Sequence, residues 1–225
     1  MPKLIDAAMV EARSRDLAAT TVSQTVSLFK GGTFALAAVV LIEIAFSPDD
    51  RTLRLVLWTA TLFMTMTSYN AWIHSTVTLF REGAGNILAM ILQGMLELML
   101  FAVLTPRAVA QSWRAWPLIA AAFFLVTGVR LAIRMNAGLA VAPSIAPLFA
   151  LAQKNRIATA RAVLAASLLN VAVAVPVLAL ALASPWPRWF GFALALFNGA
   201  HACIAMVLQE RERAAMESML AAAAG

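Results

Sequence analysis

Residues Asn86–Leu104 read NILAMILQGMLELMLFAVL, and Glu97 is the one ionisable side chain in this run of nineteen. A helix needs about 20 mostly apolar residues to cross the hydrocarbon core of a bilayer, which is roughly 30 Å thick. Inside that core the backbone has no water to bond to, so a spanning segment of this kind is expected to be a helix. The run therefore predicts a transmembrane helix with a carboxylate near its middle.

Further apolar stretches lie on both sides of this one. The chain has 225 residues, of which 62% are hydrophobic and 12% are charged, so it has too little polar surface for a soluble domain of this size. The sequence predicts an all-α, polytopic transmembrane bundle of about six spans. The expected spans are 31–46, 55–80, 86–104, 116–135, 162–183 and 189–209.

The predicted organisation has three parts. Residues 1–30 are expected to form a cytosolic or interfacial helix, and residues 31–209 the transmembrane domain. Within that domain, residues 136–160 contain Pro143 and Pro147 and are expected to lie on the inner leaflet. Residues 210–225 are expected to continue the last span as a cytosolic helix.

The positions of lysine and arginine predict the orientation. With the N-terminus inside, the 17 basic residues divide 12 to 5 in favour of the cytosolic side, where Lys30 is counted as the residue just before the first span. Both termini are then cytosolic, in a multi-pass protein of the bacterial cytoplasmic membrane. The formal net charge of +6 does not indicate nucleic-acid binding, because the basic residues stand in small groups at span ends. An aromatic belt is expected at the outer boundary, formed by Trp113, Trp116, Trp186 and Trp189.

Polar side chains recur at helical spacing within the spans. Asn70 and His74 stand four residues apart in the second span, and Gln93 and Glu97 four apart in the third. A charge at the bilayer centre costs about 2.5–3.5 kcal/mol on insertion scales, so such groups rarely face lipid. We therefore expect Glu97 to pair with Arg130 of the fourth span inside the bundle, with His74 and Gln93 nearby.

Other polar side chains in the spans are further candidates for a buried site. Glu43 stands alone in the outer half of the first span, where it suits either a protonated state near the interface or contact with another chain. Asn170, Asn198 and His201 lie in the last two spans. Membrane asparagines and glutamines often join helices, at about 0.6 kcal/mol for each hydrogen bond.

The two histidines of the chain raise the question of a cofactor. His74 and His201 fall at comparable depth, which a bis-histidine haem would need. Two membrane histidines are also common without haem, and together with the single Cys203 they make a poor metal set. No cofactor and no metal are therefore predicted, and a haem-binding electron carrier is kept as an alternative.

The chain has none of the familiar catalytic motifs. It lacks a GxSxG serine, HExxH, a P-loop and a dinucleotide-binding glycine pattern, so it is not expected to be an enzyme. Ionisable groups on aligned faces instead favour a channel or transporter for a small ion or polar solute. The other alternative is a non-catalytic accessory or scaffold subunit, in which Glu97 and Arg130 only clasp helices. The expected partners are the lipid bilayer and either further copies of the chain or a larger membrane complex.

Overall fold

The computed structural model describes residues 7–77, 84–106, 112–136, 157, 161–172 and 188–224, and the regular structure in these ranges is entirely helical. The prediction of an all-α protein is confirmed for this part of the chain. The helices are α1 (Ala7–Phe46), α2 (Arg51–Val77), α3 (Ala84–Ala102), the 3-10 helix η1 (Ser112–Ala115), α4 (Trp116–Asn136), a helical stretch at Arg161–Ala172, and α6 (Arg188–Ala224).

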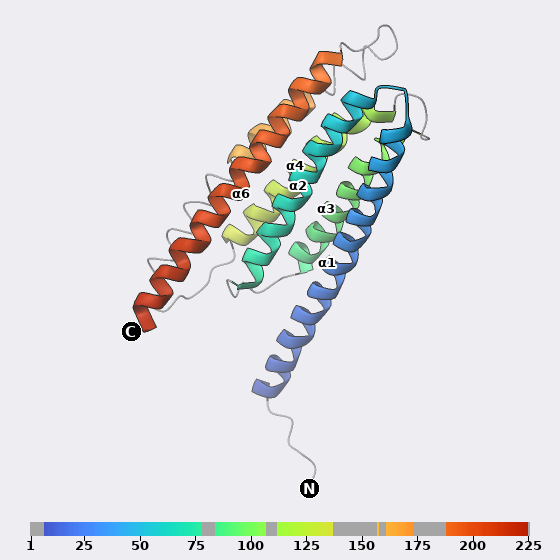
Figure 1. Cartoon of the computed structure of the whole chain (residues 1–225). Helices are drawn as coiled ribbons and strands as arrows, with labels where there is room; N and C mark the ends of the chain where they lie inside the picture. Colours follow the sequence, from blue (N-terminus) through green and yellow to red (C-terminus); the bar gives the residue numbers. More distant parts are fainter. Residues whose placement is uncertain are drawn as a thin grey trace.

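The long helices lie side by side, and α1 to α4 alternate in direction (Figure 1). The helix α2 packs against α6, while α3 packs against both α1 and α4. The start of α1 and the end of α6 extend past the bundle in the same direction (Figure 1). Both ends of the described chain therefore lie at one end of the bundle, which is called the terminal end below.

In the part of the chain that the structure describes, two helical segments are long and apolar enough to cross a membrane: Ser23–Phe46 in α1 and Trp189–Arg211 in α6. Shorter apolar helices occupy Ile87–Ala102 and Arg161–Ala172. The segment in α1 begins before residue 31, and α1 passes through residue 30 without a break. Of the predicted inner-leaflet segment, 136–160, only the first residue and residue 157 belong to the described part of the chain.

Large apolar side chains cover outward faces of these helices. Ile42 and Phe46 of α1 and Leu196 of α6 are among the most exposed, with 59%, 86% and 69% of their surface accessible. Soluble monomers rarely expose extensive apolar patches. Such faces need a covering other than water.

The apolar core is concentrated at the end of the bundle opposite the terminal end. Trp116 is fully buried there and donates its indole N–H to the Thr61 hydroxyl at 2.8 Å. Trp113 is also buried, whereas Trp189 is 62% exposed. The prediction of an aromatic belt at the outer boundary is therefore wrong for Trp113 and Trp116, whose side chains pack in the apolar core instead. Trp186 lies outside the described residues.

Arg54 ties the start of α2 to the chain just after α3. Its Nη1 donates to the Leu104 carbonyl at 2.8 Å, two residues beyond the end of α3 at Ala102. Burial lowers the pKa of the Arg54 guanidinium from its ordinary value, against the opposing effect of the Asp50 and Asp49 carboxylates. This contact holds α2 and α3 together at the core end of the bundle.

Candidate functional site

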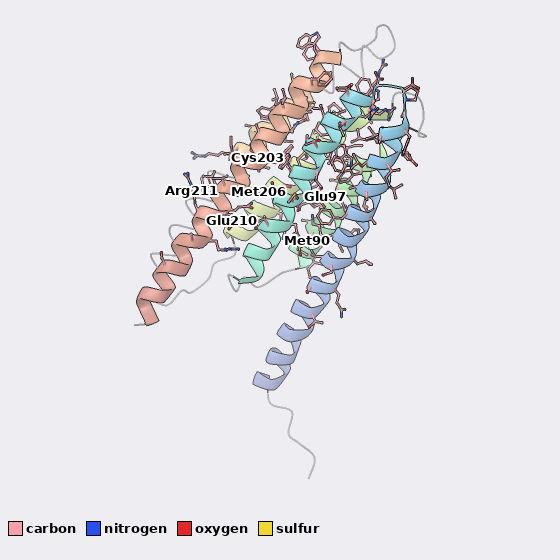
Figure 2. The ribbon with its side chains drawn as sticks, viewed as in Figure 1. Met90, Glu97, Cys203, Met206, Glu210 and Arg211 are labelled. Carbon is pink, nitrogen blue, oxygen red and sulfur yellow. The ribbon has the colours of Figure 1, made fainter. Side chains whose placement is uncertain are left out.

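Charged and polar side chains from four helices meet in the interior of the bundle. Lys30 comes from α1, Ser68 from α2, Gln93 and Glu97 from α3, and Arg130 from α4, and all five are buried. Figure 2 places Glu97 inside the bundle, between α1 and α2 in that view. We call these five residues the charged cluster.

The charged cluster is joined by hydrogen bonds. Lys30 Nζ donates to both carboxylate oxygens of Glu97, at 2.6 Å from Oε1, and lies 3.0 Å from Ser68 Oγ. Gln93 Nε2 donates to the same Ser68 Oγ at 3.0 Å. Arg130 Nη1 donates to Gln93 Oε1 at 3.2 Å. Two cations and one carboxylate are thus linked through an amide and a hydroxyl.

Local helix geometry explains why these groups meet. Gln93 and Glu97 are four residues apart and therefore project from the same face of α3. Gly94 lies on that helix against α1, where an added Cβ would be 3.0 Å from the Phe29 ring. The absence of a side chain at Gly94 lets α1 approach closely, and this approach brings Lys30, the residue after Phe29, within reach of Glu97.

The structure places Glu97, Gln93 and Arg130 in one buried cluster. The direct contact with the Glu97 carboxylate is made by Lys30, and Arg130 donates to Gln93. Lys30 was assigned to the cytosolic side because the first apolar stretch was expected to begin at residue 31. The signal that was missed is the absence of charge in residues 23–29, which allows a span to begin at Ser23 and to carry Lys30 inside it.

A cavity of about 80 Å³ adjoins the charged cluster, with Ser68, Gln93 and Arg130 in its wall. A smaller space of about 20 Å³ is also lined by Ser68, Gln93 and Arg130, together with Lys30 and Glu97. A cavity needs roughly 10–15 Å³ to hold one water, so the larger one has room for several waters or for a small solute. Its remaining polar lining consists of Thr67, Thr127, His201 and Gln209.

A second buried polar contact, between Asn170 and Asn198, uses all the hydrogen-bond donors of its two side chains. Asn170 and Asn198 are fully buried, and each side-chain NH₂ donates to the carbonyl oxygen of the other amide, at 2.9 and 3.0 Å. Each NH₂ group also donates to a main-chain carbonyl one turn earlier in its own helix. This reciprocal contact, the amide pair, joins Arg161–Ala172 to α6 and uses the donors of both side chains.

Asn70 and Glu43, two other predicted site residues, lie apart from the charged cluster. Asn70 Nδ2 donates to Gln209 Oε1 at 3.1 Å and so links α2 to α6. Glu43 is half-buried on α1, thirteen residues after Lys30 and therefore about 20 Å further along the helix axis. Neither residue is part of the hydrogen-bonded group around Glu97.

The described residues do not test the hypothesis of a haem bound by His74 and His201, which stays a prediction. His201 is half-buried and lines the larger cavity, with its ring centroid 5.5 Å from that of Phe124 in an edge-to-face arrangement. The side chain of His74 lies outside what the structure describes. Within the described ranges, no three His, Cys, Asp or Glu side chains gather closely enough to hold a metal ion.

Comparison with protein families, with curated proteins and with solved structures finds no match to this chain. A functional argument must therefore come from the charged cluster and the cavity beside it.

Proposed function

We propose that this chain is a multi-pass membrane protein that conducts or transports a small polar or ionic solute. The observation that carries the proposal is a cavity of about 80 Å³ that opens against the charged cluster inside the helix bundle. Ionisable residues within membrane-spanning helices are costly and typically face a bundle interior or a water-filled cavity, where they mark the path of a solute. A cluster that served only to join helices would need no adjoining space.

The proposed topology has six spans with both termini on the cytosolic side of a bacterial cytoplasmic membrane. The crossing-length segments Ser23–Phe46 and Trp189–Arg211 support it, as do the exposed apolar faces of α1 and α6. An even number of crossings also agrees with the position of both described chain ends at the terminal end of the bundle (Figure 1).

In this proposal the two parts of the site have different tasks. The solute occupies the cavity, where Arg130 and Gln93 provide charged and polar contacts and Phe123 and Phe124 provide apolar walls. The Lys30–Glu97 ion pair joins α1 to α3 beside the cavity. A change at Glu97 therefore alters the position of α1 as well as the local electrostatics.

The direct test is solute flux in liposomes that contain the purified protein. Potassium, sodium, chloride, nitrate, urea and glycerol are suitable probes, and Glu97→Gln is the variant of the cluster. The matched control is Asn170→Leu/Asn198→Leu, which removes buried polar groups away from the cavity. We expect the wild type and the control to move at least one probe, and Glu97→Gln to lose most of that flux. Flux no faster than in empty liposomes for every probe would contradict the proposal.

A second candidate function is that of a non-catalytic scaffold subunit in a membrane complex. The specific observation in its favour is that α1 and α6 both extend past the bundle at the terminal end (Figure 1). The complex isolated from its native membrane should then contain a second polypeptide in fixed stoichiometry, and removal of residues 212–225 should release it. A mass that corresponds only to copies of this chain would argue against this function.

A further inference from the structure

The second part of α1 is anchored in the apolar core of the bundle. Ala37, Val40 and Ile44 are buried side chains of that core. The indole N–H of Trp58 in α2 donates to the Ala37 carbonyl at 2.9 Å and adds a directional contact. Apolar burial and this hydrogen bond together fix residues 33–46 to the rest of the bundle.

The first part of α1, residues 7–30, contacts the bundle differently, and we call it the arm. Val26 of the arm packs with Met90 of α3 in a small cluster that is separate from the main core. One turn later, Lys30 forms the ion pair with Glu97. Because charged groups are strongly hydrated, part of the energy lost when such a pair separates is regained once water reaches it. The contacts of the arm are therefore of a kind that can be released without unfolding the core.

Two consecutive glycines, Gly31 and Gly32, join the arm to the anchored part. Both are exposed within an unbroken helix, and an added Cβ at either would meet no described residue within 4 Å. Glycine is the least favourable helix residue after proline, and sharp helix kinks often occur at such small residues. At the same place the Thr33 hydroxyl donates to the Phe29 carbonyl at 2.8 Å, a contact that often bends helices. Helix α1 thus has a pliable point directly after Lys30.

The arm also forms part of the wall of the smaller space. The lining residues that it contributes are Thr25, Val26, Phe29 and Lys30. Ser68, Gln93 and Arg130 line both this space and the larger cavity. The Ser68 hydroxyl oxygen accepts from Lys30 Nζ and from Gln93 Nε2, so departure of the arm removes one contact that holds this shared wall. A movement of the arm away from α3 would widen the smaller space on the side next to the larger cavity.

We propose that the arm is a lid that swings about Gly31 and Gly32, with the Lys30–Glu97 ion pair as its latch. In the closed position the latch joins α1 to α3 and the arm covers the smaller space. In the open position the shared wall is reached from the terminal end of the bundle. The inference rests on the proposed transport function and adds the moving part that admits the solute.

Distances between spin labels on the purified full-length protein, measured by pulsed electron paramagnetic resonance in mild detergent, test the hinge. The arm pair is Gln24→Cys with Leu208→Cys, and the core pair is Ile42→Cys with Leu196→Cys, both in a Cys203→Ser background. All four labelled positions are exposed, and α1 and α6 lie on opposite sides of the bundle (Figure 1). A swing of roughly 30° would move residue 24, which is about 10 Å from the hinge along the helix axis, by about 5 Å.

We expect the arm pair to show a second, longer distance in Glu97→Gln, because the latch is then lost, while the core pair stays as in the wild type. Addition of Gly31→Ala/Gly32→Ala should reduce the longer population by about threefold or more, since alanine resists helix bending better than glycine. Gly128→Ala in α4 is the matched control, because its added Cβ would make an ordinary contact of 3.7 Å with Val163. This control should leave both distance distributions unchanged.

Several outcomes would overturn the lid. One is a longer population that is equal with and without the two alanines, and another is a single unchanged distance in Glu97→Gln. If Glu97→Gln fails to fold, the wild type decides: its arm pair should have a broader distribution than its core pair, and Gly31→Ala/Gly32→Ala should narrow it. Equal widths would contradict a hinge. A change of oligomeric mass in the alanine variant would assign the glycines to packing between copies and overturn it as well.

Solute flux in liposomes separates the lid from the proposed function. Flux that falls in Gly31→Ala/Gly32→Ala while the unfolding midpoint rises supports both. Movement of the arm in a protein that moves none of the probes supports the lid and contradicts transport. Flux that the two alanines leave unchanged, although they hold the arm in one position, supports transport and overturns the lid.

Discussion

The charged cluster and the amide pair are two buried polar contacts between helices, and they differ in what they leave open. The amide pair consists of two neutral side chains whose donors are all used, on each other and on their own helices. The charged cluster has three charged side chains, and it borders a cavity of about 80 Å³. Burial of polar groups alone therefore does not distinguish a candidate site from a structural contact, whereas charged side chains beside a cavity do.

The largest effect on stability is expected from Glu97→Ala. The substitution leaves Lys30 buried without the carboxylate that accepts its hydrogen bonds. Breaking one side of a buried ion pair typically costs about 3–5 kcal/mol. Denaturant unfolding in mild detergent should show a loss of that size.

The control for Glu97→Ala is the double substitution Lys30→Met/Glu97→Met. Replacing a whole buried ion pair by apolar residues of similar volume is often neutral or stabilising. The double variant should therefore recover most of the stability. An unfolding midpoint of Glu97→Ala equal to that of the wild type would contradict a stabilising ion pair between Lys30 and Glu97.

A smaller effect is expected from Asn170→Leu in the amide pair. It leaves the buried Asn198 amide without its partner, at a cost of about 1–3 kcal/mol. The double variant Asn170→Leu/Asn198→Leu should be closer to the wild type, and its solute flux should be unchanged. Loss of flux in a stable double variant would remove the functional distinction between the two regions.

Gly94→Ala should have an effect of about 1 kcal/mol, the low end of the usual cost of overpacking. The new methyl group would meet the Phe29 ring at 3.0 Å and push α1 away from α3. Gly31→Ala is the matched control, because an added Cβ there meets nothing within 4 Å. The control should stabilise the helix by up to about 1 kcal/mol, since alanine is the better helix former. Equal unfolding midpoints for the two variants would contradict the close contact at Gly94.

The smallest effect is expected from Asn70→Ala, which removes the hydrogen bond to Gln209. Hydrogen bonds between membrane helices contribute about 0.6 kcal/mol on average, so the unfolding midpoint should move only slightly. A loss of stability in Asn70→Ala as large as that in Asn170→Leu would contradict this small contribution.

Two sequence arguments led to parts of the candidate site. Helical spacing assigned Gln93 and Glu97 to one face of a helix, and the cost of a buried charge predicted an ion pair between Glu97 and Arg130. The structure places all three in the charged cluster, with Lys30 in direct contact with Glu97. Lys30 was missed because it was counted with the surface residues that orient the protein. Hydropathy measures how apolar a segment is, and it does not show where along a long helix the buried section begins.

The sequence by itself determined that the described chain is helical and which side chains share a helix face, because long apolar runs require internal backbone hydrogen bonds and side chains project at fixed angles around a helix. Only the tertiary structure decided that Lys30 contacts Glu97, that Asn170 contacts Asn198 and that Trp116 turns inward to Thr61. These outcomes depend on the rotation and depth of each helix relative to its neighbours. Rotation and depth follow from how side chains on different helices fit together, and such contacts join residues that are far apart in the sequence.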